Sequence, residues 1–220
     1  MTSRERITKA VAGEPVDRKP MIVWPHDEMY SDAAIVPIGR LATAGSSPRC
    51  VLAEVFSPFS CAISKNLDLN SLYKSDPDAA EKEFKSFVQH VEREIDIALN
   101  SKADGIFYRL QGAEPKFATP MEYGGHYLEV DRALLQHAST ARMNVLCIEG
   151  GPEAYIDFVS DLPAQVFAWD LEQTGFSVSA LRKMRTGALA AASPEADILF
   201  GGGYGLLQQL AKSDAVGGVR

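Results

Sequence analysis

Short apolar segments alternate with helical segments along most of the chain, and this alternation constrains the fold more than any other feature. A short apolar run bounded by turn residues is typical of a buried strand. Such runs occur about seven times, at residues 20–24, 32–36, 50–56, 103–108, 144–148, 164–169 and 196–200. Helical patterns separate most of them. Strands that alternate with helices form a parallel sheet, and this number of strands favours a TIM-type barrel over a doubly wound sheet.

The length of the chain sets a limit on that barrel. A complete TIM barrel usually takes about 250 residues, whereas this chain has 220 residues and no eighth strand is recognised before its end. We therefore expect one domain over residues 1–220, with an α/β TIM-barrel-like fold that is shortened or incomplete at the C-terminal end and lacks its last strand and helix. Open strand edges invite pairing with another chain, so a homo-oligomer is predicted.

Several helix boundaries are visible in the sequence. Thr2 with Glu5, and Thr119 with Glu122, have the spacing of capping boxes. Pro77 begins the clearest helix, which has an apolar stripe on one side and many Glu and Lys residues on the opposite side. The two glycines that follow Glu122 weaken the start of the second capped helix. Residues 39–49 are rich in small and turn residues and predict a loop.

Composition excludes several classes of protein. The 22 basic and 29 acidic residues give a formal charge of −7 without a basic run, which argues against a nucleic-acid partner. No apolar run is long enough to cross a bilayer, and the first residues lead into no signal-peptide core, so we expect a cytoplasmic protein with no membrane partner. The three cysteines are widely spaced and include no Cys-x-x-Cys pair. Any metal site must therefore be assembled in space.

Cys147 and Glu149 are the strongest candidates for chemistry. They are two residues apart at the end of an apolar strand, and side chains at i and i+2 of a strand point to the same face. In a barrel of parallel strands, that end is where catalysis takes place. The pair could hold a metal, or place a nucleophile beside an acid or base. The alternative is that Cys147 is a small buried hydrophobe and Glu149 a carboxylate facing water.

Tyr108, Arg109 and Gln111 lie at the end of the fourth strand and are candidate substrate-binding residues. Arg109 is the most specific of them, because a guanidinium can bind a carboxylate through two parallel hydrogen bonds. The alternative for Arg109 is a salt bridge with Glu114.

Three further residues follow strand ends. Trp24 ends the first strand and is a candidate substrate contact, and His26 just after it is a candidate ligand or general base, or else a loop histidine. Asp170 follows the sixth strand and could accept a hydrogen bond from a ligand or act in catalysis, or else cap a helix. The glycine-rich residues 201–205 indicate tight packing at the barrel mouth more than a phosphate-binding loop.

Several segments, taken in order, resemble the uroporphyrinogen decarboxylase superfamily. Residues 4–20 resemble the entry segment of its methyltransferase-like and uncharacterised branches, and residues 57–60 resemble its Gly-Pro-Phe-Thr turn. Residues 103–107 and 119–123 resemble its fourth strand and the helix after it, and residues 166–170 resemble its strand ending in Trp-Asp. Residues 25–29 stand where true decarboxylases carry an Arg-Gln-Ala-Gly-Arg segment that holds substrate carboxylates. The resemblance is therefore closer to the methyltransferase-like branches.

That resemblance implies an activity. In the methyltransferase branch the fifth strand ends in a His-x-Cys pair that binds zinc, and Cys147 and Glu149 occupy the aligned positions. It implies metal-assisted methyl transfer from a corrinoid or small methyl donor to a thiol or similar acceptor, with a corrinoid protein as a possible partner and His26 or Asp170 completing the site. One alternative is cofactor-free decarboxylation of a porphyrinogen, which needs no metal. A second is a non-catalytic paralogue that acts as a binding or assembly module.

Overall fold

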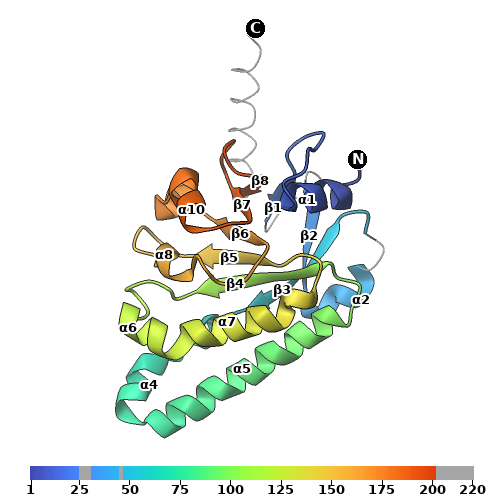
Figure 1. Ribbon diagram of the computed structural model, residues 1–220. Helices are drawn as coiled ribbons and strands as arrows, with labels where there is room; N and C mark the ends of the chain where they lie inside the picture. The colour runs from blue at the N-terminus through green and yellow to red at the C-terminus, as the bar shows by residue number, and fades with distance from the viewer. Residues whose placement is uncertain (25–30, 45–46, 202–220) are drawn as a thin grey trace.

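Eight parallel strands form a nearly closed barrel (Figure 1). The computed structural model describes residues 1–24, 31–44 and 47–201, with the backbone alone for residues 43 and 44. Hydrogen-bonded neighbours follow the order β1-β8-β7-β6-β5-β4-β3-β2, and every pair is parallel. The strands are β1 Met21–Val23, β2 Ala33–Pro37, β3 Cys50–Phe56, β4 Gly105–Gln111, β5 Val145–Glu149, β6 Val166–Trp169, β7 Ala188–Ala191 and β8 Ile198–Gly201. The predicted fold class is therefore confirmed.

The strand count corrects one expectation. The structure has an eighth strand, so the prediction that the last strand is missing was wrong. The strand overlooked in the sequence is β7, whose four residues, Ala188 to Ala191, are all buried. Its alanines and leucine carry little strand propensity, and burial by the neighbouring strands decides their conformation. The last predicted strand is β8, which pairs with β1. Apart from Gly201, the glycine-rich segment lies outside the described residues.

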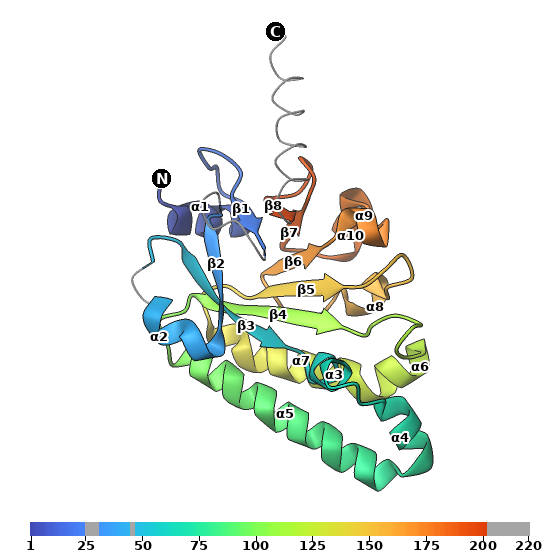
Figure 2. The ribbon, with the colours of Figure 1, turned by 180° about the vertical axis from the view of Figure 1, so that it is seen from behind.

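Helices surround the outer face of the sheet, and α5 and α7 lie side by side beneath β3 and β4 (Figures 1 and 2). The α-helices are α1 Ser3–Val11, α2 Leu41–Ala44, α3 Pro58–Ser64, α4 Leu69–Ser75, α5 Pro77–Leu99, α6 Pro120–Glu122, α7 Leu128–His137, α8 Ile156–Val159, α9 Leu171–Thr174 and α10 Val178–Met184. The described residues also form two 3-10 helices, η1 Ile38–Arg40 and η3 Ala138–Thr140, and one π-helix, η2 Tyr123–Tyr127. No helix within the described ranges is long and apolar enough to cross a membrane.

The helix signals in the sequence were mostly correct. Both predicted capping boxes form, at the starts of α1 and α6. The two glycines after Glu122 lie in η2, the π-helix that interrupts the predicted helix before α7 begins. The predicted loop at residues 39–49 was wrong in part, because η1 and α2 occupy its first half. Both elements are short enough to form in a segment of small residues.

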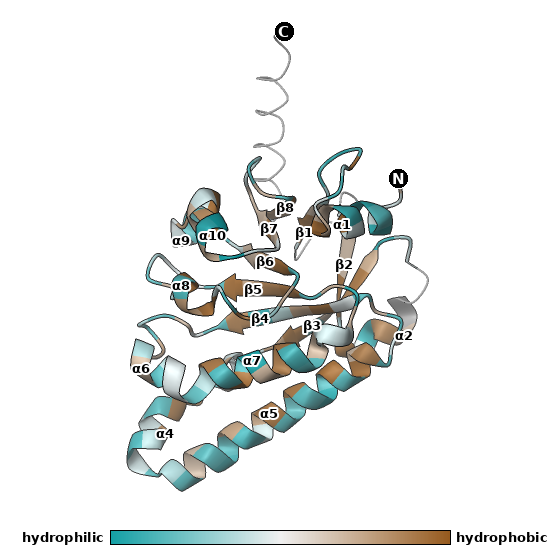
Figure 3. Ribbon diagram, viewed as in Figure 1, coloured by the Kyte–Doolittle hydropathy of each residue, from teal (hydrophilic) through white to brown (hydrophobic). Residues whose placement is uncertain are grey.

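Two apolar clusters divide the buried residues between the inside and the outside of the barrel. The colouring by hydropathy shows strands that are mostly apolar, whereas α5 alternates between apolar and polar residues (Figure 3). Outside the strands, Phe84, Phe87 and Val91 of α5 pack against the sheet. The inner cluster is formed by the alternate residues of the strands together with α1, and includes Ile7, Ile22, Ala33, Leu52, Phe107, Val145, Cys147, Val166, Ala168, Ala190 and Ile198.

The barrel closes between β1 and β2 through the side chain of Asp32 rather than a complete ladder. The Asp32 amide donates to the Met21 carbonyl over 2.7 Å, and its carboxylate accepts the Met21 amide over 3.0 Å. The guanidinium groups of Arg6 and Arg18 approach the same carboxylate to 2.6 and 2.7 Å. This completely buried aspartate therefore joins β1, β2 and α1 at the seam.

A second buried carboxylate, Asp131 of α7, has two tyrosine hydroxyl groups as partners. Tyr108 donates to one oxygen over 2.6 Å and Tyr123 to the other over 3.0 Å. Burial raises the pKa of Asp131 to about 7, against the lowering effect of the two tyrosine hydrogen bonds. Asp131 is therefore a carboxyl group that takes up a proton near neutrality in the folded protein.

We predict that Asp131 makes the protein less stable as the pH rises from about 4 to about 7. In that range the unfolded chain gains a solvated carboxylate while the folded chain keeps the proton, so the free energy of unfolding falls by a few kcal/mol. The fall ends once the folded group also ionises. The Asp131→Asn variant lacks this contribution, and its urea-denaturation midpoint should fall less over that range than that of the parent. The matched control is the exposed Asp157→Asn, and parallel profiles for Asp131→Asn and the parent would contradict the prediction.

Candidate functional site

Three charged side chains meet at the C-terminal mouth of the barrel: Glu54, Arg109 and Glu149, here called the mouth cluster. They come from the adjacent strands β3, β4 and β5. Arg109 donates through one terminal nitrogen to Glu54 Oε1 over 3.0 Å and through Nε to Glu149 Oε1. Each lies two positions beyond a residue of the inner apolar cluster, so all three face the barrel interior.

Two aromatic rings also contact the guanidinium of Arg109. Its central carbon lies 4.4 Å from the ring centre of Trp24 and 4.3 Å from that of Phe56. Trp24 follows β1 and also packs against Phe107, with ring centres 5.7 Å apart. Cation–π contacts of this kind add to the ion pairs in fixing the guanidinium plane.

The electrostatics of the mouth cluster leave it with a net negative charge. The exposed fractions of the side chains of Glu54, Arg109 and Glu149 are 17%, 18% and 27%. Burial lowers the pKa of Arg109. The hydrogen bond and charge of Glu149 and the charge of Glu54 raise it by a larger amount, so the pKa lies above its ordinary value. One permanent cation is thus shared by two carboxylates.

Cys147 lies one layer below the mouth cluster. It shares the interior face of β5 with Glu149, as their spacing predicts, but it belongs to the inner apolar cluster and is only 3% exposed. Burial, reinforced by the charge of Glu149, raises the pKa of its thiol well above the ordinary value. A protonated, enclosed thiol is not poised as a nucleophile.

The described residues do not assemble a metal site. Within those ranges there is no group of three or more histidine, cysteine, aspartate or glutamate side chains that could hold a metal ion. Glu149 is engaged by Arg109, and Cys147 is enclosed by apolar neighbours. His26, predicted together with Asp170 as a residue that could complete the site, lies outside the described residues.

The other predicted site residues are placed differently. Asp170 is exposed and caps α9, accepting the Gln173 amide over 2.9 Å. Tyr108 points away from the barrel interior into the layer beneath α7, where it reaches Asp131. Gln111 is half-buried, and its main-chain amide donates to Ser60 Oγ over 2.8 Å.

Glu114, the predicted alternative partner of Arg109, does not pair with it. Glu114 accepts the Gly151 amide over 2.8 Å, and Arg109 pairs with Glu54 and Glu149 instead. Glu54 was missed in the sequence. It was detectable as a carboxylate inside an otherwise apolar strand, two positions from Leu52 and from Phe56.

Comparison with known proteins supports the fold alone. No model of a known protein family matches the chain, and no curated protein matches it. Among solved structures, a methyltransferase from Methanosarcina mazei is similar, with a TM-score of 0.75 and 13% sequence identity over 98% of this chain and 99% of that one. The chain therefore has a TIM-barrel-like fold that it shares with a methyltransferase.

We predict that Arg109→Gln destabilises the protein by about 1–3 kcal/mol at pH 7, because two partly buried carboxylates then face each other without a cation. Urea denaturation at pH 7 measures this loss. Adding Glu149→Gln to the variant should restore part of the stability, and the control is Arg93→Gln on the exposed side of α5. Equal stability of Arg109→Gln and Arg93→Gln would contradict the role of the mouth cluster.

Proposed function

We propose that the protein is a methyltransferase-like enzyme of the uroporphyrinogen decarboxylase superfamily, with its active site at the mouth cluster. The observation that carries the proposal is the position of Glu54, Arg109 and Glu149 at the C-terminal mouth of the barrel, the end at which barrel enzymes hold their catalytic residues. The sequence segments that resemble the superfamily and the fold shared with a methyltransferase support it.

The proposed reaction is methyl transfer from a corrinoid or small methyl donor to a thiol acceptor. The acceptor sulfur forms a bond to the methyl carbon, the bond between that carbon and the donor breaks, and its electron pair stays with the donor. The thiol proton must leave for the sulfur to attack, and a carboxylate of the mouth cluster can accept it. Arg109 positions both carboxylates, while Trp24 and Phe56 supply an apolar surface beside them.

Zinc held partly by Cys147 and Glu149 is a separate part of the proposal, based on the resemblance. A catalytic zinc ion needs three protein ligands and an open position, and the described residues do not supply that set, so the steps above use no metal. Metal analysis of the purified protein is the test. Stoichiometric zinc that is lost in Cys147→Ala supports the site, and protein that binds none contradicts it.

The engagement of Arg109 argues against decarboxylation of a polycarboxylate. That reaction needs cationic side chains that are free to bind substrate carboxylates, whereas Arg109 is already paired with Glu54 and Glu149. A porphyrinogen would have to displace both.

The methyl-transfer proposal is tested with methylcobalamin as donor and 2-mercaptoethanol as acceptor. We expect the protein to accelerate loss of the methylcobalamin absorbance over the reaction in buffer. Glu149→Gln should lower the rate roughly 100-fold, because general-base catalysis is typically worth at least that factor. The exposed Glu92→Gln of α5 is the matched control and should retain the parent rate. A parent rate equal to that in buffer, with or without added zinc, would contradict the proposal, and a stable oligomer without turnover would favour a binding or assembly module.

A further inference from the structure

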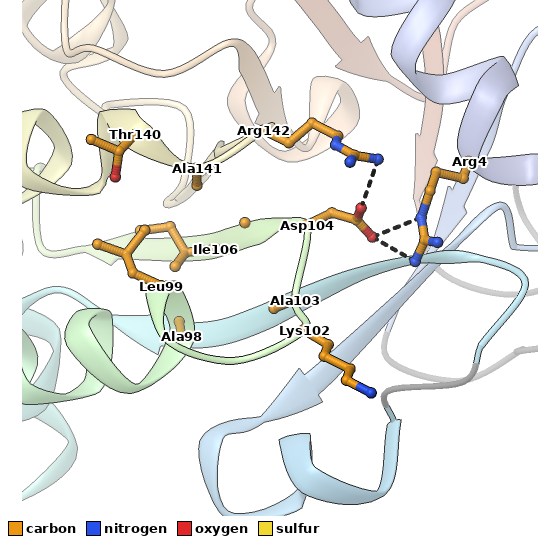
Figure 4. Close-up of a pocket in the computed structure, with 11 residues that line it drawn as sticks. Arg4, Ala98, Leu99, Lys102, Ala103, Asp104, Ile106, Thr140, Ala141 and Arg142 are labelled. Atoms are coloured by element: carbon orange, nitrogen blue, oxygen red, sulfur yellow. Dashed lines mark hydrogen bonds and ion pairs between the residues drawn. The ribbon is translucent and has the colours of Figure 1, made fainter.

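A cavity of about 420 Å³ opens at the end of the barrel opposite the mouth cluster (Figure 4). It lies where β4 begins, between the last residues of α5, the turn that follows η3, and Arg4 of α1. No step of the proposed methyl transfer uses it. Its volume falls within the range of small-molecule sites, which begins at about 300 Å³.

Basic side chains dominate the ionisable groups that line this cavity. Arg4, Lys102 and Arg142 are basic, and Asp104 is the acidic group among the lining residues. Asp104 is buried. It forms ion pairs with Arg4 at 3.1 Å and with Arg142 at 3.4 Å, and it accepts a hydrogen bond from the Val51 amide over 2.9 Å. The three basic groups and one carboxylate give the cavity a formal charge of about +2 near neutral pH.

Two of the basic groups retain capacity for a ligand. The side chain of Arg142 is 60% exposed and uses one terminal nitrogen towards Asp104, which leaves other donors of its guanidinium available. Lys102 is exposed, and within the described part of the chain it has no hydrogen-bond or ion-pair partner. Arg4 is more committed, since it also donates to the Arg49 carbonyl over 3.3 Å.

The remaining residues that line the cavity have uncharged side chains. Leu99, Ile106 and Ala141 lie on the side away from Asp104, with the Thr140 side chain beside them (Figure 4). The end of α5 that reaches the cavity is its C-terminal end, which carries a partial negative charge. Attraction of an anion would therefore come from the side chains and not from the helix.

We propose that this cavity binds a small phosphate monoester. A phosphate monoester carries a charge between about −1.5 and −2 at pH 7, which matches the charge of the lining side chains better than a single carboxylate does. The phosphate accepts hydrogen bonds from Arg142 and Lys102, and the uncharged wall contacts the small organic group attached to it. A cavity of this size has room for that group, so inorganic phosphate alone fills it only in part.

Calorimetric titration of the full chain tests this with four probes: glycerol 3-phosphate, inorganic phosphate, glycerol and acetate. We expect glycerol 3-phosphate to bind most tightly, inorganic phosphate more weakly, and glycerol and acetate not measurably. Binding should weaken as salt is added, because the attraction is between partly exposed charges. No heat with glycerol 3-phosphate, or equal binding of acetate and glycerol 3-phosphate, would overturn the proposal.

Variants locate the binding. Arg142→Gln and Lys102→Gln change exposed side chains and should each weaken glycerol 3-phosphate binding about 10-fold, which corresponds to about 1.4 kcal/mol. Ala141→Leu keeps the charge but reduces the space, and it should also weaken binding. The control is Lys85→Gln on the exposed side of α5, which removes the same charge away from the cavity. Equal affinity in the parent and the three cavity variants would place the ligand elsewhere and overturn the proposal.

Discussion

The closure of the barrel at Asp32 is the constraint on which the other features depend. A sheet of parallel strands exposes unpaired main-chain groups at its two edges, here β1 and β2. Asp32 supplies hydrogen bonds to Met21 and pairs with Arg6 and Arg18, so the seam is held by side chains where the ladder is incomplete. The burial of so much charge is tolerated because each carboxylate oxygen has a donor. Opening of this seam would separate β1 from β2.

The mouth cluster depends directly on that closure. Trp24 extends from β1, whereas Arg109 comes from β4 on the other side of the sheet order. Their contact therefore exists only in the closed barrel. Three adjacent strands supply the charges, and a ring from the far side of the barrel covers the guanidinium. The two ends of the barrel also differ in charge. The mouth cluster has more carboxylates than cations, whereas the cavity near Asp104 has more cations than carboxylates.

Most of the architecture could be predicted from the sequence, because alternating strands and helices have few arrangements and the capping boxes have fixed spacing. The elements that could not be predicted depend on tertiary contacts. The strand β7 has a sequence that would also suit a helix, and only its place between β6 and β8 makes it a strand. The π-helix at residues 123–127 depends on how Tyr123 and Tyr127 pack beneath the barrel, which no local pattern specifies.

The site was predicted in part for a similar reason. The positions of Arg109, Glu149 and Trp24 at strand ends were sufficient to mark them as mouth residues. Strand periodicity also separates Tyr108 from Arg109, since neighbouring residues face opposite sides of a sheet, and that signal was available in the sequence. The partners of Arg109 could not be read in the same way, because the pairing with Glu54 depends on the register of β3 against β4. Likewise, the enclosure of Cys147 depends on Phe107 and Ala168 from neighbouring strands.

The pairing of the first strand with the last one has a consequence for synthesis of the chain on the ribosome. β1 finds its ladder partner in β8, where Met21 stands opposite Leu199 and Val23 opposite Gly201. The ladder between β1 and β8 can therefore form only after residues 198–201 have left the ribosome. During that interval β1 carries apolar side chains and free main-chain donors, a combination that favours aggregation in nascent chains. Arg6 and Arg18, which precede this strand in the sequence, and Asp32, which follows it, place charges on both sides of the apolar segment during that interval.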